Sequence, residues 1–340
     1  MSPIIRECEK QDIPYYLVHT GQHYSYEMDR VFFKELELPG AHYNLDVGSG
    51  SQAEQTGKIL LGVERVLEKE PTDIVLVQGD TNTVMASALA AVKLHIPVGH
   101  VEAGLRSFDR AMPEEINRIV TDHISDYLFA PTKAAREYLL DEGIPDKTIH
   151  VTGNTIVDAV FQNLEIAQRK ADALSRFGLN KGSYFLVTAH RAENVDDKYR
   201  LIGIFQALLA VRKEYDLPVI FPIHPRTQKM LLSFGISPEG IQTVPPVGFF
   251  EFLQLEANAR LVLTDSGGIQ EETCILGVPC VTLRENTERP ETLEVGSNIL
   301  AGTDADCIIK AVQAMLQPHA TWSNPFGDGK AGEKIIEICT

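Results

Sequence analysis

Short apolar runs alternate with longer helical patterns along the 340-residue chain, and this alternation limits its fold more than any other feature. It is typical of βαβ units, in which parallel strands form a sheet that helices cover. The runs that read as strands are YYLVHT, DIVLVQGD, VGHVEAG, YLFAPT, IHVTGNT, YFLVTAHRAEN, PVIFPIHP, IQTV, ARLVLTDSGG and PCVTLREN. Nearly every run ends in polar residues or glycine. Since ligands of open α/β sheets bind at the carboxyl ends of the strands, the sequence predicts a site in these loops.

Length and charge narrow the class of protein further. A chain of 340 residues exceeds the usual size of one core, so we expect two domains. The net charge of −16 argues against nucleic acid or an anionic membrane as the main partner. We find no signal peptide and no apolar run of membrane-spanning length, and therefore expect a cytoplasmic enzyme. The cysteines lack metal-type spacing, so we expect buried, reduced thiols at Cys8, Cys274, Cys280, Cys307 and Cys339.

The segment DSGGIQEE carries the clearest binding signal. An apolar strand breaks at Ser266, Gly267 and Gly268 and turns directly into a helix, so that backbone amides and the positive helix end can bind an anion. Glu271 or Glu272 would repel a phosphate beside it, but a carboxylate suits the two hydroxyls of a ribose. Phosphate and ribose together indicate a nucleotide. The alternative is that both glutamates only complement the helix dipole.

Acidic residues follow predicted strands in the first half of the chain. Asp80 in QGDTNT is either a helix N-cap or a catalytic group. Glu102 in HVEAGLRSFD lies at the carboxyl end of a strand, where an acid favours function. Glu114 and Glu115 begin a helix in MPEEINR, and at least one of them is expected to complement the helix dipole.

Two predicted strands of the second half each end in a histidine near an arginine, His190 with Arg191 and His224 with Arg226. One such histidine is usually a hydrogen-bonded structural residue, but two pairs at one sheet edge favour a site. We predict no metal site, because no histidine pair at i, i+4 stands near a third ligand. The lack of G-x-G-x-x-G after any strand argues against a dinucleotide cofactor, and we expect no cofactor.

Taken in order, several segments closely resemble the non-hydrolysing UDP-N-acetylglucosamine 2-epimerases: QGDTNT, HVEAGLRSFDRAMPEEINR, VTGNTIVDA, AHRAEN, DSGGIQEE, TERPE and NPFGDGKA. The resemblance covers essentially the whole chain. It implies two Rossmann-like domains that face each other across a cleft, as in GT-B glycosyltransferases. Residues 1–165, joined by a final helix at 327–340, would hold the sugar and the catalytic acids, and residues 166–326 would bind UDP. The resemblance also implies a homodimer that interconverts UDP-N-acetylglucosamine and UDP-N-acetylmannosamine.

The resemblance assigns expected roles to single residues. Ser266, Gly267 and Gly268 should bind the diphosphate, Glu272 the ribose hydroxyls, and Glu271 should only complement the helix dipole. We expect the remaining substrate contacts at Arg289 for the diphosphate or sugar, Phe252 for the uracil, Asn154 near the sugar, and Arg191 and His224.

The implied reaction expels UDP from C1 as the C2 proton leaves, gives 2-acetamidoglucal, and returns UDP with the proton on the opposite face. Departure of UDP needs donors on the diphosphate, which His190 and the Ser-Gly-Gly turn can supply. Positive charge at C1 needs carboxylates, and both faces of C2 need proton transfer. Asp80, Glu102 and Glu114 match the three acids of the family. Which acid serves which face stays open.

The chain departs from the family in two places. Bacterial relatives bind a second UDP-N-acetylglucosamine as an activator through a Gln-His-x-Gln stretch, but here Gln22 and His23 are followed by Ser25. This leaves allosteric activation open. The chain also opens on Ser2 and Pro3, which we expect to cap and begin a helix, where the family has a strand and a Gly-Thr-Arg-Pro-Glu loop. We therefore expect that one strand is missing from the first sheet and that the first domain is the less stable one.

Two other functions remain possible on this sequence. A GT-B glycosyltransferase would use the same nucleotide turn but has less need of three acids. A non-catalytic UDP-sugar-binding protein would bind without turnover, which the intact set of acids with His190 disfavours. The substituents on the sugar are also open, because some relatives act on diacetamido uronic acids.

Overall fold

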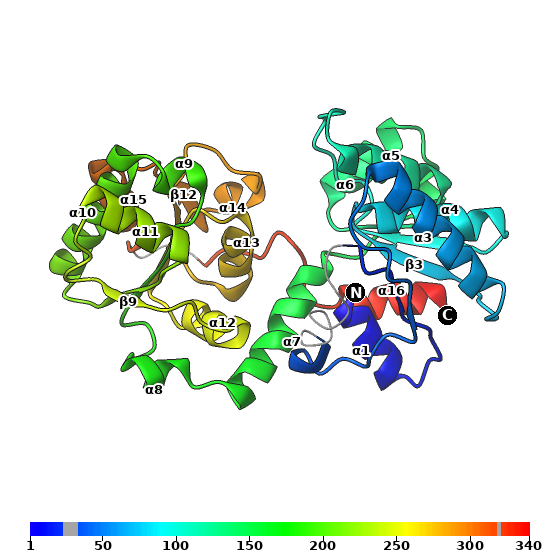
Figure 1. Cartoon of the computed structure of the whole chain (residues 1–340), viewed down its shortest axis with the longest axis horizontal. Coiled ribbons are helices and arrows are strands. Elements are labelled where there is room, and N and C mark those ends of the chain that lie inside the picture. The colour runs from blue at the N-terminus through cyan, green and yellow to red at the C-terminus, as the bar shows by residue number, and fades with distance from the viewer. Residues whose placement is uncertain (23–32, 318–320) are drawn as a thin grey trace. The chain divides into compact units, whose positions relative to one another are not determined.

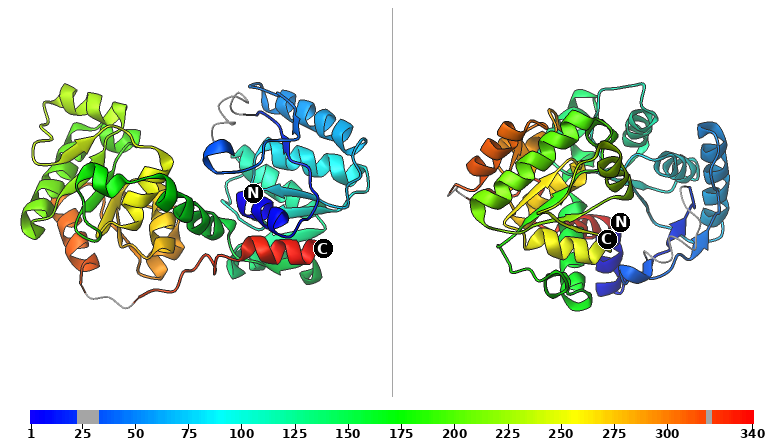
Figure 2. Two further views of the ribbon diagram at one scale, coloured as in Figure 1. Left: turned by 90° about the horizontal axis from the view of Figure 1, so that it is seen from below. Right: turned by 60° about the vertical axis from the view of Figure 1, so that its left-hand side comes forward.

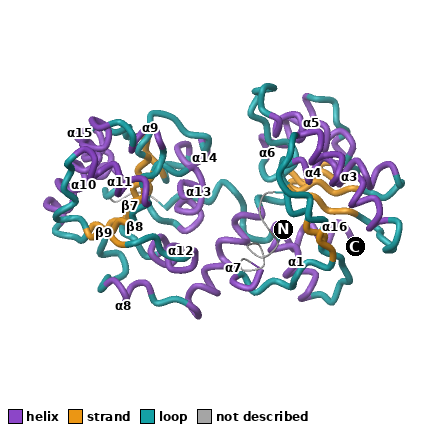
Figure 3. Tube along the Cα trace, viewed as in Figure 1, coloured by secondary structure: helices purple, strands orange, loops and turns teal. Residues whose placement is uncertain are grey.

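The computed structural model describes residues 1–22, 33–317 and 321–340, and these form two compact units (Figure 1). The first unit comprises Met1–Ala159 and Phe326–Thr340, and the second comprises Val160–Pro325. In each unit, helices flank parallel strands (Figure 3), which confirms the predicted α/β class. His23 and Ser25 lie outside the described residues. None of the described helices has the length and apolar character needed to cross a membrane.

The first unit contains two parallel sheets. Strands β1 (Val18–His19) and β2 (Tyr43–Asn44) form one of them. The four-stranded sheet has the order β3 (Val75–Gln78), β4 (Val98–Val101), β5 (Tyr127–Ala130) and β6 (Ile149–Val151). The helical elements are α1 (Ser2–Lys10), α3 (Gln52–Leu67), α4 (Asn82–Lys93), α5 (Pro113–Ile124), α6 (Lys133–Asp141), the 3₁₀ turn η1 (Asp146–Thr148) and α16 (Ala331–Cys339). Helix α7 (Thr155–Lys170) begins in this unit and continues into the second.

Helices α1 and α16 lie side by side in the first unit, near both ends of the chain (Figure 2). Their apolar side chains, among them Ile4 and Ile335, pack with Phe129 of β5 in one buried cluster. Asp158 of α7 fixes the start of α16, because its carboxylate accepts hydrogen bonds from the amides of Ala331 and Gly332 at 3.2 and 2.9 Å. Apolar packing and this one carboxylate together hold the last helix of the chain on this unit.

The second unit has one six-stranded parallel sheet in the order β12-β11-β10-β7-β8-β9. Its strands are β7 (Phe185–Thr188), β8 (Val219–Pro222), β9 (Gln242–Val244), β10 (Leu261–Thr264), β11 (Cys280–Thr282) and β12 (Asn298–Leu300). Its helices are α8 (Ala173–Phe177), α9 (Ala192–Val195), α10 (Lys198–Tyr215), α11 (Pro225–Phe234), α12 (Phe249–Ala257), α13 (Gly267–Leu276), α14 (Pro290–Glu294) and α15 (Ala305–Met315).

Both faces of this sheet are buried, which explains why its strands read as nearly continuous apolar runs. Phe185 and Val187 of β7 belong to one buried cluster with side chains of α10 and α15, whereas Leu186 belongs to another with side chains of α8 and α12. Side chains that alternate along one strand therefore supply both halves of the core.

The structure corrects several local predictions. Helix α1 includes Ser2 and is preceded by Met1 at its N-cap, so the predicted cap was one residue late. Thr81, not Asp80, is the N-cap of α4. The short strands β2 and β12 were not predicted. The expectation of buried thiols is wrong for Cys307, which is exposed, and for Cys339, which is only partly buried; all the cysteines are free.

Strands β1 and β3 belong to different sheets among the described residues, although a doubly wound domain would normally join them through a central strand. The amino end of the chain lies beside β3, where the Met1 amine donates to the side-chain oxygen of Gln78. The expectation of a missing strand in this unit stays a prediction.

Candidate active site

The carboxyl ends of β3 and β4 bring two of the predicted acids to one edge of the first sheet. Gln78 and Val101 are partners in the parallel register, so Asp80 and Glu102 follow neighbouring strand ends. Glu102 has a left-handed backbone with φ of 70°, which costs a non-glycine residue about 1 kcal/mol or more. Its carboxylate accepts from the side-chain amide of Gln78 at 2.6 Å. Such strain is concentrated at functional sites, which favours a functional Glu102.

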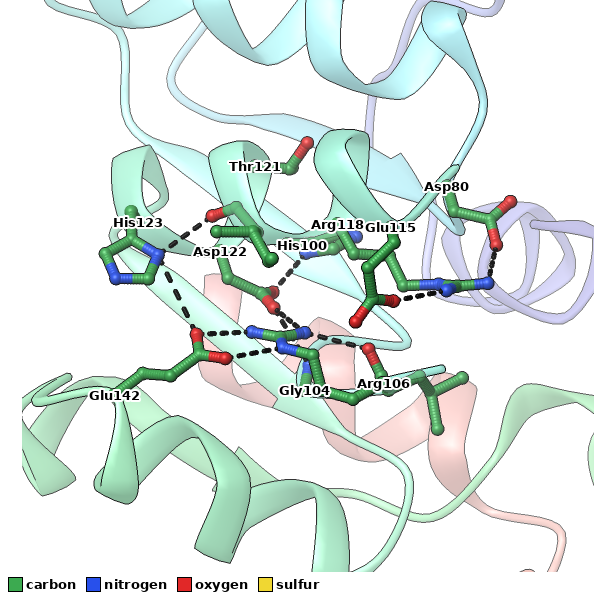
Figure 4. A network of polar contacts seen from close by, with 12 residues as sticks. Asp80, His100, Gly104, Arg106, Glu115, Arg118, Thr121, Asp122, His123 and Glu142 are labelled. Carbon is green, nitrogen blue, oxygen red and sulfur yellow. Dashed lines mark hydrogen bonds and ion pairs between the residues drawn. The ribbon is translucent and has the colours of Figure 1, made fainter. Parts of the chain in front are cut away.

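Arg118 of α5 connects Asp80 with Glu115 (Figure 4). Its guanidinium donates to Oδ2 of Asp80 at 2.5 Å and to Oε2 of Glu115 at 2.7 Å. Asp80 therefore faces a cation instead of capping a helix. Glu115 is buried and also accepts from the amides of Ser107 and Phe108 at 2.9 and 3.0 Å. Burial alone would raise the pKa of Glu115, but these donors together lower it. Glu115 thus holds the loop before α5, beyond any effect on the helix dipole.

Glu114, the neighbouring predicted acid, is only half-buried and has no hydrogen bond or ion pair within the part of the chain that the structure describes. It stands at the first turn of α5, which contacts α4 and β4. The elements that carry the three predicted acids therefore adjoin one another. Of the two adjacent glutamates, the structure leaves Glu114 available for a ligand.

A buried ionic cluster lies beneath these loops (Figure 4). The ring of His100 in β4 contacts Oδ1 of Asp122 at 2.6 Å through Nδ1 and the carbonyl oxygen of Gly79 at 2.9 Å through Nε2. Asp122 also pairs with Arg106 at 2.7 Å, and Arg106 pairs at 2.7 Å with Glu142, the C-cap of α6. The cluster joins the loop that carries Asp80, strand β4 and helix α5. Sequence analysis missed His100 and Asp122, since buried polar residues carry no periodic signal.

Asn154 lies near the same edge of the sheet. Its Oδ1 accepts from the amide of Ile156 at 3.1 Å, at the start of α7. The next residue, Thr155, accepts from the Gln78 amide that also holds Glu102. Asn154 therefore has a structural role, and its proximity to Glu102 leaves the predicted sugar contact open.

A cavity of about 320 Å³ opens at the carboxyl edge of the second sheet. It includes three of the residues predicted from sequence, His190, His224 and Phe252, and the ring centroids of the two histidines are 6.3 Å apart. The remaining lining residues are Thr188, Ala189, Pro222, Pro246, Val247 and Ile269. A mostly apolar cavity with a few polar groups suits a flat heterocyclic ring. His224 also accepts from the Arg226 amide at 3.2 Å, so it caps α11 as well.

Asp265 organises the His190 loop, and sequence analysis missed it. This fully buried carboxylate accepts from the amides of His190 and Arg191 at 3.0 and 2.9 Å and from the side chain of Asn194 at 3.2 Å. Its backbone carbonyl accepts from Nε of Arg191 at 2.9 Å. An acid that directly follows an apolar strand and precedes Ser266 was a signal that could have been used.

The predicted anion site is the start of α13, where Ser266 is the N-cap and makes no side-chain cap hydrogen bond. The first-turn amides of a helix have no partner within the helix, so they can donate to a ligand. A Cβ placed on Gly268 would meet open space, and one on Gly267 would lie 3.5 Å from a carboxylate oxygen of Glu288. The glycine pair leaves this helix start accessible.

Arginines gather around Glu288. Arg284 binds it at 2.8 Å, and Arg191 lies 3.8 Å from it. The hydrogen bond from Arg284 is the main cause that lowers the pKa of Glu288 to about 2. The neighbouring Arg289 instead pairs through Nε with Glu271 at 3.0 Å. The prediction that Glu271 only complements the helix dipole is therefore incomplete: it holds an arginine that was predicted to bind the substrate.

Glu272 is half-buried and adjoins Glu256 of α12. Burial raises its pKa, and the hydrogen bond with Glu256 opposes that rise.

Within the described ranges, no group of three or more His, Cys, Asp or Glu residues could hold a metal ion.

Comparison with known proteins agrees with this arrangement. Residues 6–340 match the model of the UDP-N-acetylglucosamine 2-epimerase family. The UDP-N-acetylglucosamine 2-epimerase of Methanocaldococcus jannaschii is 57% identical over 347 residues, which cover 100% of this chain and 95% of that protein. The chain belongs to the UDP-N-acetylglucosamine 2-epimerase family.

Solved structures of 2-epimerases share the fold. One structure of the M. jannaschii enzyme has a TM-score of 0.93 at 56% identity, covering 99% of this chain and 94% of that chain. Another, in complex with UDP-GlcNAc and UDP, has a TM-score of 0.77 at 57% identity with the same coverage. A UDP-2,3-diacetamido-2,3-dideoxy-D-glucuronate 2-epimerase of Pseudomonas aeruginosa is 42% identical, covering 97% of this chain and 92% of that protein. The predicted family and its GT-B-like pair of Rossmann-like domains are thereby confirmed.

Proposed function

We propose that this protein is an isomerase that interconverts UDP-N-acetylglucosamine and UDP-N-acetylmannosamine at C2 of the sugar. One observation carries the proposal: the chain is 57% identical, along its whole length, to a UDP-N-acetylglucosamine 2-epimerase. The reaction proceeds by elimination of UDP to 2-acetamidoglucal and re-addition of UDP, with the C2 proton returned on the opposite face.

The second domain binds the nucleotide in this proposal, and we place its boundary with the first near residue 165. Amides of Ser266, Gly267 and Gly268 hold the diphosphate, and the helix dipole of α13 adds to the attraction. The uracil enters the cavity lined by Phe252 and His224, whose size and apolar lining support this assignment. Glu272 accepts from the ribose hydroxyls.

Cationic and polar groups then assist departure of UDP from the sugar. His190 lines the cavity and contacts Asp265, which supports a role as a fixed donor to the diphosphate. Arg191 and Arg289 supply positive charge at the same place. Arg289 must exchange its contact with Glu271 for the substrate or share it between the two.

The first domain, with the terminal segment that forms α16, acts on the sugar. Asp80, Glu102 and Glu114 stabilise the positive charge that develops at C1 and transfer the C2 proton on both faces. The strained backbone of Glu102 and the partner-free state of Glu114 within the described residues support these roles. Asn154 contacts the sugar.

Incubation with UDP-N-acetylglucosamine in deuterated water tests the proposal. We expect deuterium at C2 of both sugars and minor amounts of free UDP and 2-acetamidoglucal. Epimerised product without exchange at C2 would refute the elimination route. A glycosyltransferase would instead need an acceptor for turnover, and a non-catalytic binding protein would bind UDP and release no product.

We propose UDP-N-acetylglucosamine as the substrate instead of the diacetamido uronate. The chain is 57% identical to the M. jannaschii enzyme and 42% identical to the P. aeruginosa enzyme. Turnover of both UDP-sugars by the same preparation decides between them.

We also propose that the protein is a homodimer and acts in the cytoplasm. Light scattering on the purified protein tests the homodimer, because a monomeric mass would contradict it.

A further inference from the structure

A second glutamate lies beneath the ribose-binding glutamate and has no assigned role. Glu256 stands in the last turn of α12, the helix that contacts α13 (Figure 1). Its side chain is 0% exposed, and both carboxyl oxygens lack a hydrogen-bond partner in the described structure when Glu256 is treated as a carboxylate. A buried, unpaired carboxylate costs several kcal/mol, so this group is retained as the neutral acid. A neutral acid carries an O–H donor that needs an acceptor.

Glu272 of α13 carries an acceptor for this proton. Its carboxylate adjoins Glu256, and burial together with the charge of Glu272 raises the pKa of Glu256. Cys280 of β11 also faces it, with a thiol whose pKa burial raises to about 12. On α8, Arg176 pairs with Glu251 at the other end of α12. On α13, the charge of Glu271 raises the pKa of Glu272, and Glu271 is itself held by Arg289.

We propose that Glu256 is a positioning residue for the nucleotide site: it keeps its proton and donates it to one carboxylate oxygen of Glu272. The second oxygen of Glu272, with the negative charge, is then fixed for the ribose hydroxyls of a nucleoside diphosphate. This inference rests on the proposed function, because it concerns how the ribose contact is built. It accounts for an acid that is otherwise a costly feature of a core.

The arrangement makes nucleotide affinity depend on pH in a defined direction. Burial raises the pKa of Glu272, so acidification protonates it and removes the charged acceptor. The donor from Glu256 opposes this, since a hydrogen bond to the charged form favours ionisation. Without that donor, Glu272 titrates at a higher pH, and UDP affinity starts to fall at a higher pH during acidification.

Two substitutions separate donation from simple packing. Glu256→Met fills a similar volume without a donor, and Glu256→Gln keeps an N–H donor without a titratable proton. Glu251→Gln on the same helix is the matched control, because that glutamate pairs with Arg176 away from α13. The binding of UDP and of 2′-deoxy-UDP is measured by calorimetry between pH 5.5 and 8.5 for the wild type and each variant.

We expect Glu256→Met to lose about tenfold in UDP affinity at neutral pH and more at lower pH, because one hydrogen bond to a charged group is lost. Its loss for 2′-deoxy-UDP should be smaller. Glu256→Gln should restore affinity to within about twofold of the wild type. Equal affinities in Glu256→Met and the wild type at all pH values, or equal losses in the two Glu256 variants, would overturn the inference. Absence of UDP binding by the wild type would instead overturn the proposed function.

Infrared spectroscopy supplies a test that needs no nucleotide. The wild type minus Glu256→Gln difference spectrum at neutral pH should contain the carbonyl band of one protonated carboxylic acid. This measurement remains decisive even if Glu256→Met folds poorly. A difference spectrum with only carboxylate bands would show that Glu256 is ionised and would refute the shared proton.

Discussion

Replacing Glu115 by glutamine should loosen the loop before α5 and destabilise the first unit. The Glu115 carboxylate accepts four hydrogen bonds, from the amides of Ser107 and Phe108, the Ser107 hydroxyl and Arg118, at 2.7–3.0 Å. Glutamine replaces one acceptor oxygen by an NH₂ group, which cannot accept a hydrogen bond from the donors that surround it. At least one of these donors then loses its partner in a buried place, since Glu115 is only 1% exposed.

The expected loss is about 3 kcal/mol. A single hydrogen bond to a charged group contributes about 1.5–3 kcal/mol, and removing one partner of a buried ion pair costs about 3–5 kcal/mol. Arg118 moderates the cost because it keeps its contact with Asp80 at 2.5 Å. The contributions are not additive, so we take the overlap of the two ranges. For a domain of this size, about 3 kcal/mol corresponds to a drop of roughly 6–12 °C in melting temperature.

Differential scanning calorimetry between pH 4 and 8 measures this effect. The pKa of Glu115 is lowered in the folded state, so its stabilisation is present above the ordinary glutamate pKa and is lost as pH falls through the folded value. The gap between wild type and variant should therefore be full above about pH 5 and should shrink on further acidification. Hydrogen exchange should also speed up at the amides of Ser107 and Phe108.

Glu114→Gln is the matched control for this experiment. It makes the same chemical change one residue earlier, where the described structure gives the side chain no partner. We expect its melting temperature to stay within about 1 °C of the wild type while turnover falls strongly. An unchanged melting temperature and unchanged exchange in Glu115→Gln would show that the carboxylate does not hold the loop.

Five substitutions test other parts of the structure. Asp80→Asn should lose most turnover and keep its affinity for UDP. Glu272→Ala should weaken UDP binding about 10- to 100-fold in calorimetry, because a charged acceptor is removed. Unchanged binding would mean that Glu272 only complements the helix dipole. Gly104→Ala should lower the free energy of unfolding by about 3 kcal/mol, because its φ is +79° and the new Cβ would lie 2.3 Å from a carbonyl oxygen of α6. Gly143→Ala is the control: its φ is +85° but its Cβ would meet open space, so the loss should be only about 1 kcal/mol. Glu256→Gln should gain stability over the wild type as pH rises above about 4.5, because a raised folded pKa makes the wild type lose stability with increasing pH, and a constant difference across pH would contradict this.

The sequence predicted strands and motifs well wherever the signal was local. Every strand of the second sheet except β12 coincides with a predicted run, because burial on both faces favours apolar residues within a strand. The Ser266-Gly267-Gly268 turn was equally local, because a glycine pair between strand and helix allows little else. The contacts between site residues could not be predicted in this way, because they join positions far apart in the sequence. Asp265 and His190 are 75 residues apart and meet only because β7 and β10 pair in one register.

Helix α5 illustrates why the rest of the site could not be predicted. Its buried residues are polar, namely Glu115, Asn117, Thr121 and Asp122, so hydrophobic periodicity gives no indication of which face points inward. Each of them has a specific partner instead; Asn117, for example, donates to the backbone carbonyl of Asp80 at 2.9 Å. Directional bonds allow far fewer arrangements than apolar contacts do, and an unpaired member is costly. A helix fixed in this way can hold the loop of Asp80 at a defined position, which is what the proposed proton transfer at C2 would require.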